Sequence, residues 1–141
     1  MLSRLWPNGV MHTSLHHVGH RPWGLPNARW TWRQSWCELL FAHWRVPVAQ
    51  LRPYIPEPLT IDTFHGDAFI AVVPFRMQDV ALRPFPPVPG TACFPEINVR
   101  TYVRYRDRPG VWFLSLDASN PLAVWAARTF FHLPYFWAKM C

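Results

Sequence analysis

Apolar and polar residues alternate along much of the second half of the chain, a pattern typical of β-strands with one buried face. The segments EINVRTYVRYR, residues 96–106, and VWFLSLDAS, residues 111–119, flank the turn signal DRPG at 107–110. Two alternating runs around such a turn predict an antiparallel hairpin.

A second pair of β-rich runs lies earlier in the chain. LTIDTF at 59–64 and AFIAVVPFRMQDVAL at 68–82 surround Gly66 and Asp67, which predicts another hairpin. The residues between Trp36 and Trp44 also alternate, and we interpret them as one strand, although helical spacing fits some of them. The segment 83–95 holds five prolines and is expected to form a long loop or lid.

Two short helices are predicted. Pro47 starts the first, which spans about two turns before Pro53 or Pro56 ends it. Asn120 followed by Pro121 is a good start for the second, because an asparagine caps the first turn and proline suits the first helical position.

The second helix is expected to run to Pro134, where YFWAKMC would begin a further strand. Three large apolar side chains are expected to pack inward, with Arg128 near the boundary of that face: Leu122, Trp125 and Phe130.

Length and composition favour one small, β-rich domain. The chain has 141 residues, half of them apolar, and its 16 prolines interrupt long helices. Residues 1–28 show little periodicity and are predicted to be a flexible leader before a domain at 29–141. His12 and His16 would share a helix face, but no nearby carboxylate or thiolate completes a site, so no metal is expected.

Charge and cysteine content exclude several function classes. The formal charge is +6, but the arginines are scattered, so no nucleic-acid partner is expected. Cys37, Cys93 and Cys141 lack a disulfide or zinc spacing and indicate reduced thiols in a cytoplasm. No apolar run reaches a membrane span of about 18 residues, no signal peptide is evident, and no glycine-rich phosphate motif indicates a cofactor.

The strand that begins at Glu96 carries the main candidate site. Period-two alternation places Glu96, Asn98, Arg100 and Tyr102 on one face. Two interpretations stay open: a polar face toward solvent, or the polar lining of a pocket, where charge is costly unless paired. His43 and His132 are interpreted as structural histidines rather than catalytic bases.

Five segments in order resemble the YqjF-like family of bacterial proteins, within the acetoacetate decarboxylase-like superfamily: LLFAHWRVP, DTFHGDAFIAVVPFRM, FPEINVRTYV, RPGVWFLSLDASN and LPYFWAKM. The resemblance implies a mostly β, α+β fold, with a curved antiparallel sheet or partial barrel and two short outer helices. Family members look longer, so residues 29–141 are expected to be the N-terminal portion of such a domain, incomplete at its C-terminus.

In the decarboxylases of this superfamily, a lysine after a proline forms a Schiff base with the substrate. The resemblance matches Arg128 and Pro134 to the same motif, and it places Tyr135 where that lysine would stand and Phe136 at the next lysine. Glu96 is similar to a pocket glutamate of those enzymes. A phenol forms no imine, so decarboxylase activity is not expected.

We therefore predict a protein that binds a small organic acid, carbonyl compound or aromatic ligand, with no reaction assigned and with a homo-oligomer compatible with the sequence. The predicted ligand-binding residues are Glu96, Asn98, Arg100, Arg128 and Tyr135. One alternative is a decarboxylase-like enzyme that uses Lys139, the only lysine in the chain. Another is a truncated, inactive fragment with an open sheet edge.

Overall fold

The computed structural model describes residues 17–19, 24, 27–29, 31–86 and 93–140. The chain divides into two units, residues 1–30 and 31–141. The described residues of the first unit contain no helix or strand, and His12 and His16 lie outside the described residues. The second unit carries all of the secondary structure discussed below.

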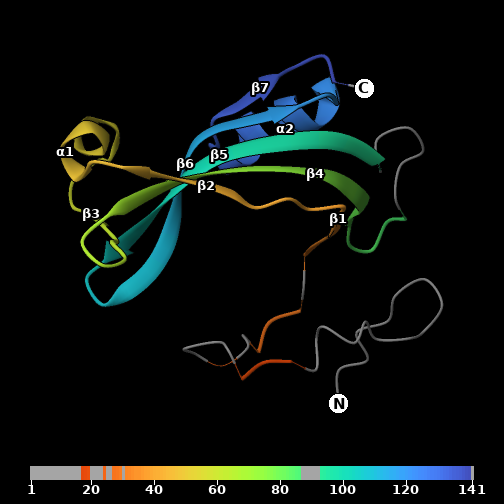
Figure 1. The fold of residues 1–141 in the computed structure, drawn as a ribbon. Helices are drawn as coiled ribbons and strands as arrows, with labels where there is room; N and C mark the ends of the chain where they lie inside the picture. Colours follow the sequence, from red (N-terminus) through yellow and green to blue (C-terminus); the bar gives the residue numbers. More distant parts are fainter. Residues whose placement is uncertain (1–16, 20–23, 25–26, 30, 87–92, 141) are drawn as a thin grey trace. The chain divides into compact units, whose positions relative to one another are not determined.

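The second unit is built on one seven-stranded sheet (Figure 1). The strands are β1 (Trp32–Cys37), β2 (Ala42–Val46), β3 (Thr60–Ile61), β4 (Ala68–Leu82), β5 (Cys93–Tyr105), β6 (Arg108–Ala118) and β7 (Tyr135–Trp137). Their order is β1-β4-β5-β6-β7, while β2 also pairs with β4 and β3 with β5. Only β6 and β7 pair in parallel among these strands.

Two short helices accompany the sheet, α1 (Val48–Leu51), which continues into the 3₁₀ turn η2 (Arg52–Tyr54), and α2 (Pro121–Phe131). The sheet does not close into a barrel, because β1 and β7 end the strand order. This confirms the predicted fold class, a mostly β, open sheet with two short helices. The hairpin between the two alternating runs is also confirmed, but its turn is Arg106–Asp107 rather than 107–110, since Tyr105 pairs with Arg108.

The prediction of a hairpin around Gly66 was wrong. Residues 59–64 do not pair with β4 as a strand, and only a Phe64–Asp67 bridge closes the turn. Thr60 pairs instead with Arg104 of β5. The long strand β4 already has β1 and β2 along one edge and β5 along the other, so no edge is left for β3.

The single strand expected between Trp36 and Trp44 is two strands. Cys37 at the end of β1 pairs with Arg76, and Ala42 at the start of β2 pairs with Val72. Glu38 between them has a φ of 56°, in the left-handed region, which interrupts the extended backbone. Both strands therefore follow the same edge of β4 with a kink between them.

The proline-rich segment begins as a turn and ends as a strand. Residues 83–85 form the turn, while residues 87–92 lie outside the described residues. Cys93 and Pro95 belong to β5 and pair with Gln78 and Arg76. The expected loop over 83–95 is therefore too long at its C-terminal end.

The predicted cap of α2 is confirmed, but the predicted orientation of the helix was wrong. The Asn120 side chain accepts hydrogen bonds from the backbone nitrogens of Leu122 and Ala123 at 3.0 and 3.1 Å. Val124 faces the core, whereas Leu122, Trp125 and Phe130 are 53%, 56% and 65% exposed. The helix is apolar nearly all around, so its periodicity does not identify the buried face.

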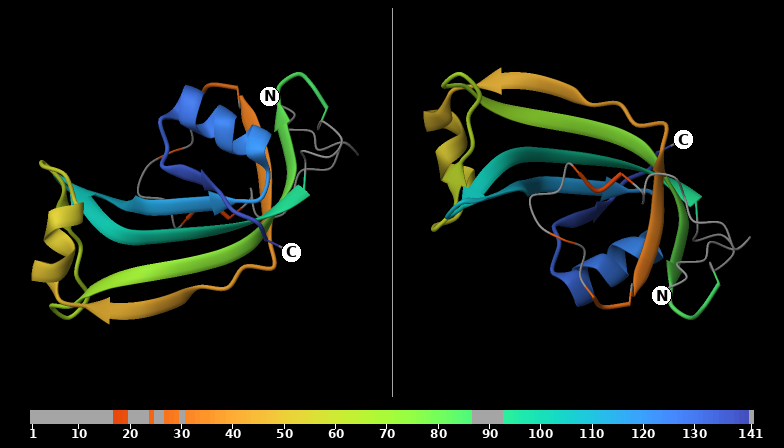
Figure 2. Two further views of the ribbon diagram at one scale, coloured as in Figure 1. Left: turned by 90° about the horizontal axis from the view of Figure 1, so that it is seen from above. Right: turned by 90° about the horizontal axis from the view of Figure 1, so that it is seen from below.

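The sheet buries different faces at its two ends, where Figure 2 shows α1 and α2. We call the side that packs against Val124 the α2 face. Its buried core comprises Ala71, Val73, Phe75, Met77, Phe94, Ala118 and Val124. The opposite side, the α1 face, buries Leu51, Ile55, Ala68 and Val103. Because successive residues of a strand point to opposite sides, β4 contributes to both cores.

Candidate functional site

The centre of the α2 face brings together side chains from four strands. Residues that pair across neighbouring strands point to the same side of a sheet. One row across the sheet comprises Val73, Asn98, Leu116 and Tyr135, and the next comprises Phe75, Glu96 and Ala118. On the other side of the Asn98 row lie His43, Ala71 and Arg100. Four of the five predicted site residues therefore share one face.

Glu96 is only 1% exposed, and one of its oxygens has a single partner. The hydroxyl group of Tyr135 donates a hydrogen bond of 2.9 Å to Glu96 Oε1. Glu96 Oε2 is buried and has no hydrogen-bond partner among the described residues. Burial raises the pKa of Glu96 to about 7, although the bond from Tyr135 and the neighbouring Asn98 amide favour the charged form. Its carboxyl group therefore exchanges a proton near neutral pH.

Asn98 and Arg100 continue this polar row along β5. Asn98 is fully buried, and neither its Nδ2 nor its Oδ1 makes a hydrogen bond of ordinary geometry within the described part of the chain, although its amide is close enough to Glu96 to favour the charged carboxylate. The same is true of Arg100 Nε. By contrast, Thr101 on the α1 face is satisfied, because its hydroxyl group donates to the Phe69 carbonyl at 2.8 Å. Burial of Glu96 and Asn98 excludes the interpretation that this part of β5 faces solvent.

A β-bulge lies beside these residues. The register between β5 and β6 shifts between Val99 and Arg100, so Leu114 is an extra residue in β6. Such bulges change the direction of neighbouring side chains and are frequent beside binding sites. Here the bulge lies between Asn98 and Arg100, each of which has a buried side-chain nitrogen without a partner among the described residues.

Burial of Glu96 predicts a pH dependence of stability. A carboxyl group with a raised pKa in the folded state binds more protons there than when unfolded, so its contribution to the free energy of unfolding falls as pH rises. The fall is expected between the ordinary glutamate pKa of about 4.3 and the raised value of about 7. We expect the Glu96→Gln variant to lack this loss.

Urea unfolding at about pH 5 and about pH 8 gives the free energy of unfolding of the variant and of the wild type. The effect is the change, between the two pH values, in the difference between these two free energies. Glu57→Gln is the control, because the Glu57 side chain is 86% exposed. If Glu96→Gln and Glu57→Gln change the pH dependence alike, Glu96 does not titrate as described.

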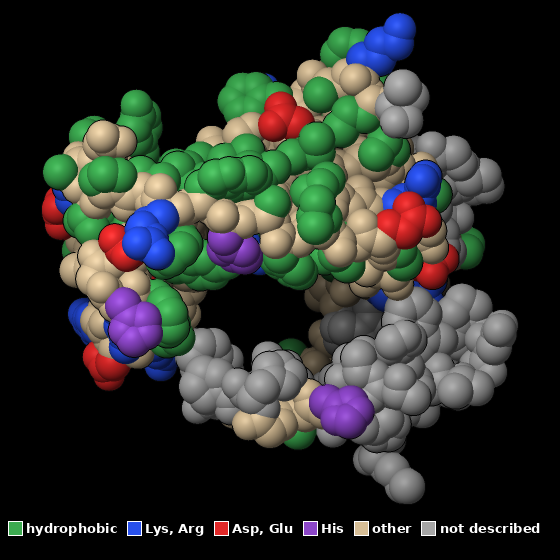
Figure 3. All heavy atoms as spheres, in the orientation of Figure 1, with side chains coloured by type: hydrophobic (Ala, Val, Ile, Leu, Met, Phe, Trp, Pro, Cys, Tyr) green, Lys and Arg blue, Asp and Glu red, His purple; other side chains and the backbone are tan. Residues whose placement is uncertain are grey.

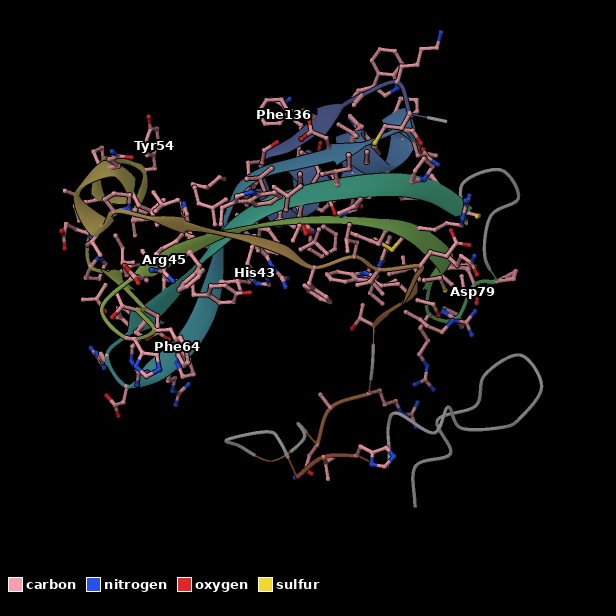
Figure 4. The ribbon with its side chains drawn as sticks, in the orientation of Figure 1. His43, Arg45, Tyr54, Phe64, Asp79 and Phe136 are labelled. Atoms are coloured by element: carbon pink, nitrogen blue, oxygen red, sulfur yellow. The ribbon has the colours of Figure 1, made fainter. Side chains whose placement is uncertain are left out.

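Phe41 and His43 lie near the site but were not among its predicted members. His43 Nε2 and the Tyr102 hydroxyl oxygen are 2.6 Å apart, and Figure 4 shows His43 on the opposite side of the strands from Phe136. The Arg100 guanidinium lies over the Phe41 ring, 5.3 Å from its centroid. Alternation along 36–44 indicated which residues share a face, but only the pairing of β2 with β4 places them near Arg100.

Other kinds of site find no support in the described part of the chain. It contains no group of three or more His, Cys, Asp or Glu side chains that could hold a metal ion. None of its helices is long and apolar enough to span a membrane.

Comparison with known proteins shows the family of this chain. Residues 33–141 match the model of DUF2071, described as an uncharacterized conserved protein. The chain belongs to the DUF2071 family. It is also 50% identical over 116 residues to the uncharacterized protein YqjF of Bacillus subtilis strain 168, a match that covers 82% of this chain and 48% of YqjF. The DUF2071 chain thus spans about half the length of this relative.

Solved structures show the same fold at low sequence identity. Acetoacetate decarboxylase from Legionella pneumophila is similar with a TM-score of 0.63 and 18% identity, over 92% of this chain and 50% of that enzyme. The enduracididine biosynthesis enzyme MppR, complexed with pyruvate, matches with a TM-score of 0.61 and 14% identity, over 79% and 42% of the two chains. The DUF2071 chain therefore has an acetoacetate decarboxylase-like fold.

Tyr135 and Lys139 lie in different surroundings near the end of this DUF2071 chain. Tyr135 is the first residue of β7 and its hydroxyl group reaches Glu96. Lys139 is exposed and follows the end of β7 at Trp137. Arg128 is the one predicted site residue that contacts only the backbone of another member, and it lies on α2 rather than on a strand of the sheet. Its guanidinium is 3.5 Å from the Tyr135 carbonyl oxygen and lies 5.9 Å from the centroid of the Phe136 ring.

Proposed function

We propose that this chain binds a small molecule with a carbonyl or carboxylate group on the α2 face. The observation that carries the proposal is the set of buried polar atoms without partners on adjacent rows of one face: Glu96 Oε2, Asn98 Nδ2 and Oδ1, and Arg100 Nε. An unsatisfied buried polar group costs about 1–3 kcal/mol. A ligand that supplies the missing partners would remove this cost.

The side chains offer complementary chemistry. The Asn98 amide can donate and accept, while the Arg100 guanidinium can hold a carboxylate through charge-assisted hydrogen bonds. Glu96, with a pKa of about 7, can accept or donate a proton beside the ligand. Burial, followed by the charge of Glu96, raises the pKa of Tyr135, so its phenol stays protonated and acts as a donor. We assign no bond-making step to these groups.

Lysine-dependent decarboxylation receives no support from the position of Lys139. Lys139 is an exposed residue beyond β7, whereas Glu96 is buried on the α2 face. Imine formation needs a neutral amine that reaches the bound carbonyl group. Among the described residues on the α2 face, the side chain beside Glu96 is a phenol.

Arg100→Ala tests the proposal. We expect the affinity for a bound organic acid to fall about tenfold or more, since a charge-assisted hydrogen bond contributes about 1.5–3 kcal/mol. Saturation-transfer NMR against a panel of organic acids and quinones identifies binders, and titration then gives the dissociation constants.

Arg104→Ala is the matched control, because Arg104 lies on the same strand and makes an exposed ion pair with Asp62 at 3.8 Å. Unchanged affinity of Arg100→Ala across every binder of the panel, with the far-ultraviolet circular dichroism spectrum intact, contradicts the proposed site.

A further inference from the structure

Flat rings gather on the α2 face next to Arg100. The His43 and Tyr102 rings are nearly parallel, with centroids 5.8 Å apart and an interplanar angle of 13°. The Phe41 and His43 rings are likewise aligned, 6.4 Å apart at 17°. Phe41 is 50% exposed, and Figure 3 shows hydrophobic side chains gathered along β2. Phe41 and His43 are not needed to fill a core, because both are exposed, whereas Tyr102 packs against the buried core of the α2 face.

The sheet register explains why the rings lie beside the polar row. His43 and Arg100 both pair with Ala71 of β4, from its two sides. The backbone nitrogen of Leu40 bonds to the Pro74 carbonyl at 3.2 Å, which places Phe41 alongside Val73, the partner of Asn98. Strands two apart are separated by about 9.6 Å. The small side chain of Ala71 lets the Arg100 side chain cross β4 to the Phe41 ring.

Polar contacts fix the orientation of this group. The bond between His43 Nε2 and the Tyr102 hydroxyl group holds both rings in their common orientation. Arg100 faces the Phe41 ring with its guanidinium, while its buried Nε has no partner among the described residues. A cation beside an ordered aromatic surface is suited to a ligand with an aromatic ring and an anionic group.

We propose that Phe41, His43 and Tyr102 select a planar aromatic carboxylate for the site that contains Arg100 and Asn98. The inference rests on the proposed function and specifies its ligand class. The ligand ring stacks on the exposed Phe41 and His43 rings, and its carboxylate accepts hydrogen bonds from Arg100. A saturated ring of the same size presents no π face, so it loses the stacking contribution.

The test compares benzoate with cyclohexanecarboxylate, which has the same carbon skeleton but no aromatic ring. Stacking contributes about 0.5–1.5 kcal/mol beyond area burial, so the 141-residue chain is expected to bind benzoate about 2- to 12-fold more tightly. Phe41→Leu is expected to remove this preference, so that the ratio of the two dissociation constants falls to about one. Tyr102→Phe is expected to weaken the preference, because it keeps the ring and loses the bond to His43.

Phe64→Leu is the matched control. Phe64 is 68% exposed and also packs against a histidine, with the His65 centroid 4.2 Å away. Figure 4 shows Phe64 apart from His43. Equal affinities of the wild type for the two acids, binding of neither, or a preference that survives Phe41→Leu overturns the inference. A different result contradicts the proposed function: Arg100→Ala leaves the affinity for every binder of the acid panel unchanged.

Discussion

Asn98→Leu is expected to stabilise the chain by about 1–3 kcal/mol and to abolish ligand binding. Asn98 is fully buried, and neither polar atom of its amide makes a hydrogen bond of ordinary geometry in the described structure. Leucine has the same number of side-chain heavy atoms, branched at the same carbon, and no polar atoms. It therefore removes an unsatisfied amide between Val73 and Leu116, the residues that pair with Asn98 on either side.

Urea unfolding measures the gain as a rise in the transition midpoint with an unchanged slope. For a domain of about 100 residues, about 1 kcal/mol corresponds to about 4–8 °C in the melting temperature. The binding measurement uses the acids that bind the wild type. An asparagine retained at a cost in stability is typical of a functional site, where stability and activity are in conflict.

Asn120→Leu is the matched control and should act in the opposite direction. Asn120 is also buried, but its side chain accepts two hydrogen bonds at the start of α2. Loss of such a cap costs about 0.5–2 kcal/mol. If Asn98→Leu destabilises the chain as Asn120→Leu does, Asn98 has a structural role and the argument for a binding site loses its main support.

Local patterns predicted the parts of this fold that form between sequence neighbours. The β5–β6 hairpin joins two alternating runs across a two-residue turn, and the Asn120–Pro121 pair marks the start of α2. Both depend on residues a few positions apart, where turn and cap chemistry are specific. The face shared by Glu96, Asn98 and Arg100 followed from the same period-two rule.

Pairing between distant segments was harder to predict from the sequence. Residues 59–64 resemble a hairpin partner of β4, yet β3 pairs with β5 because other strands occupy both edges of β4. The orientation of α2 depends on which side chains pack against the sheet, and here Val124 is buried while Trp125 is 56% exposed. The approach of Phe41 to Arg100 likewise requires the register of three strands. No single segment carries this information.

The position of Tyr135 combines both kinds of information. The resemblance to the acetoacetate decarboxylase-like superfamily implied that residue 135 stands where a Schiff-base lysine would be. The structure brings its hydroxyl group within 2.9 Å of Glu96, a residue 39 positions earlier in the chain. The pairing of β7 with β6 at Leu116, opposite Asn98, produces this contact. A side chain at position 135 is therefore directed at the proposed ligand site.

Tyr135→Lys is accordingly expected to form a covalent adduct where the wild type forms none. With a β-keto acid, a neutral amine at position 135 would form an imine with loss of water, and borohydride would reduce this imine to a stable secondary amine. Burial lowers the pKa of a lysine amine and favours the neutral nucleophile, while the charge of Glu96 opposes this shift. Mass spectrometry of the reduced, digested protein locates the adduct.

Phe136→Lys is the matched control, because residue 136 is 49% exposed and points to the other side of the short strand β7. Lys139 is present in every variant and reports the background reaction of an exposed amine. We expect labelling at position 135 to exceed both by about tenfold or more, the advantage that an oriented carbonyl group confers on an adjacent amine. Equal labelling at positions 135, 136 and 139, with circular dichroism unchanged, would show that the α2 face does not hold the keto acid. A selective adduct at position 135 would show that the site binds a carbonyl compound and that the tyrosine accounts for the missing imine chemistry.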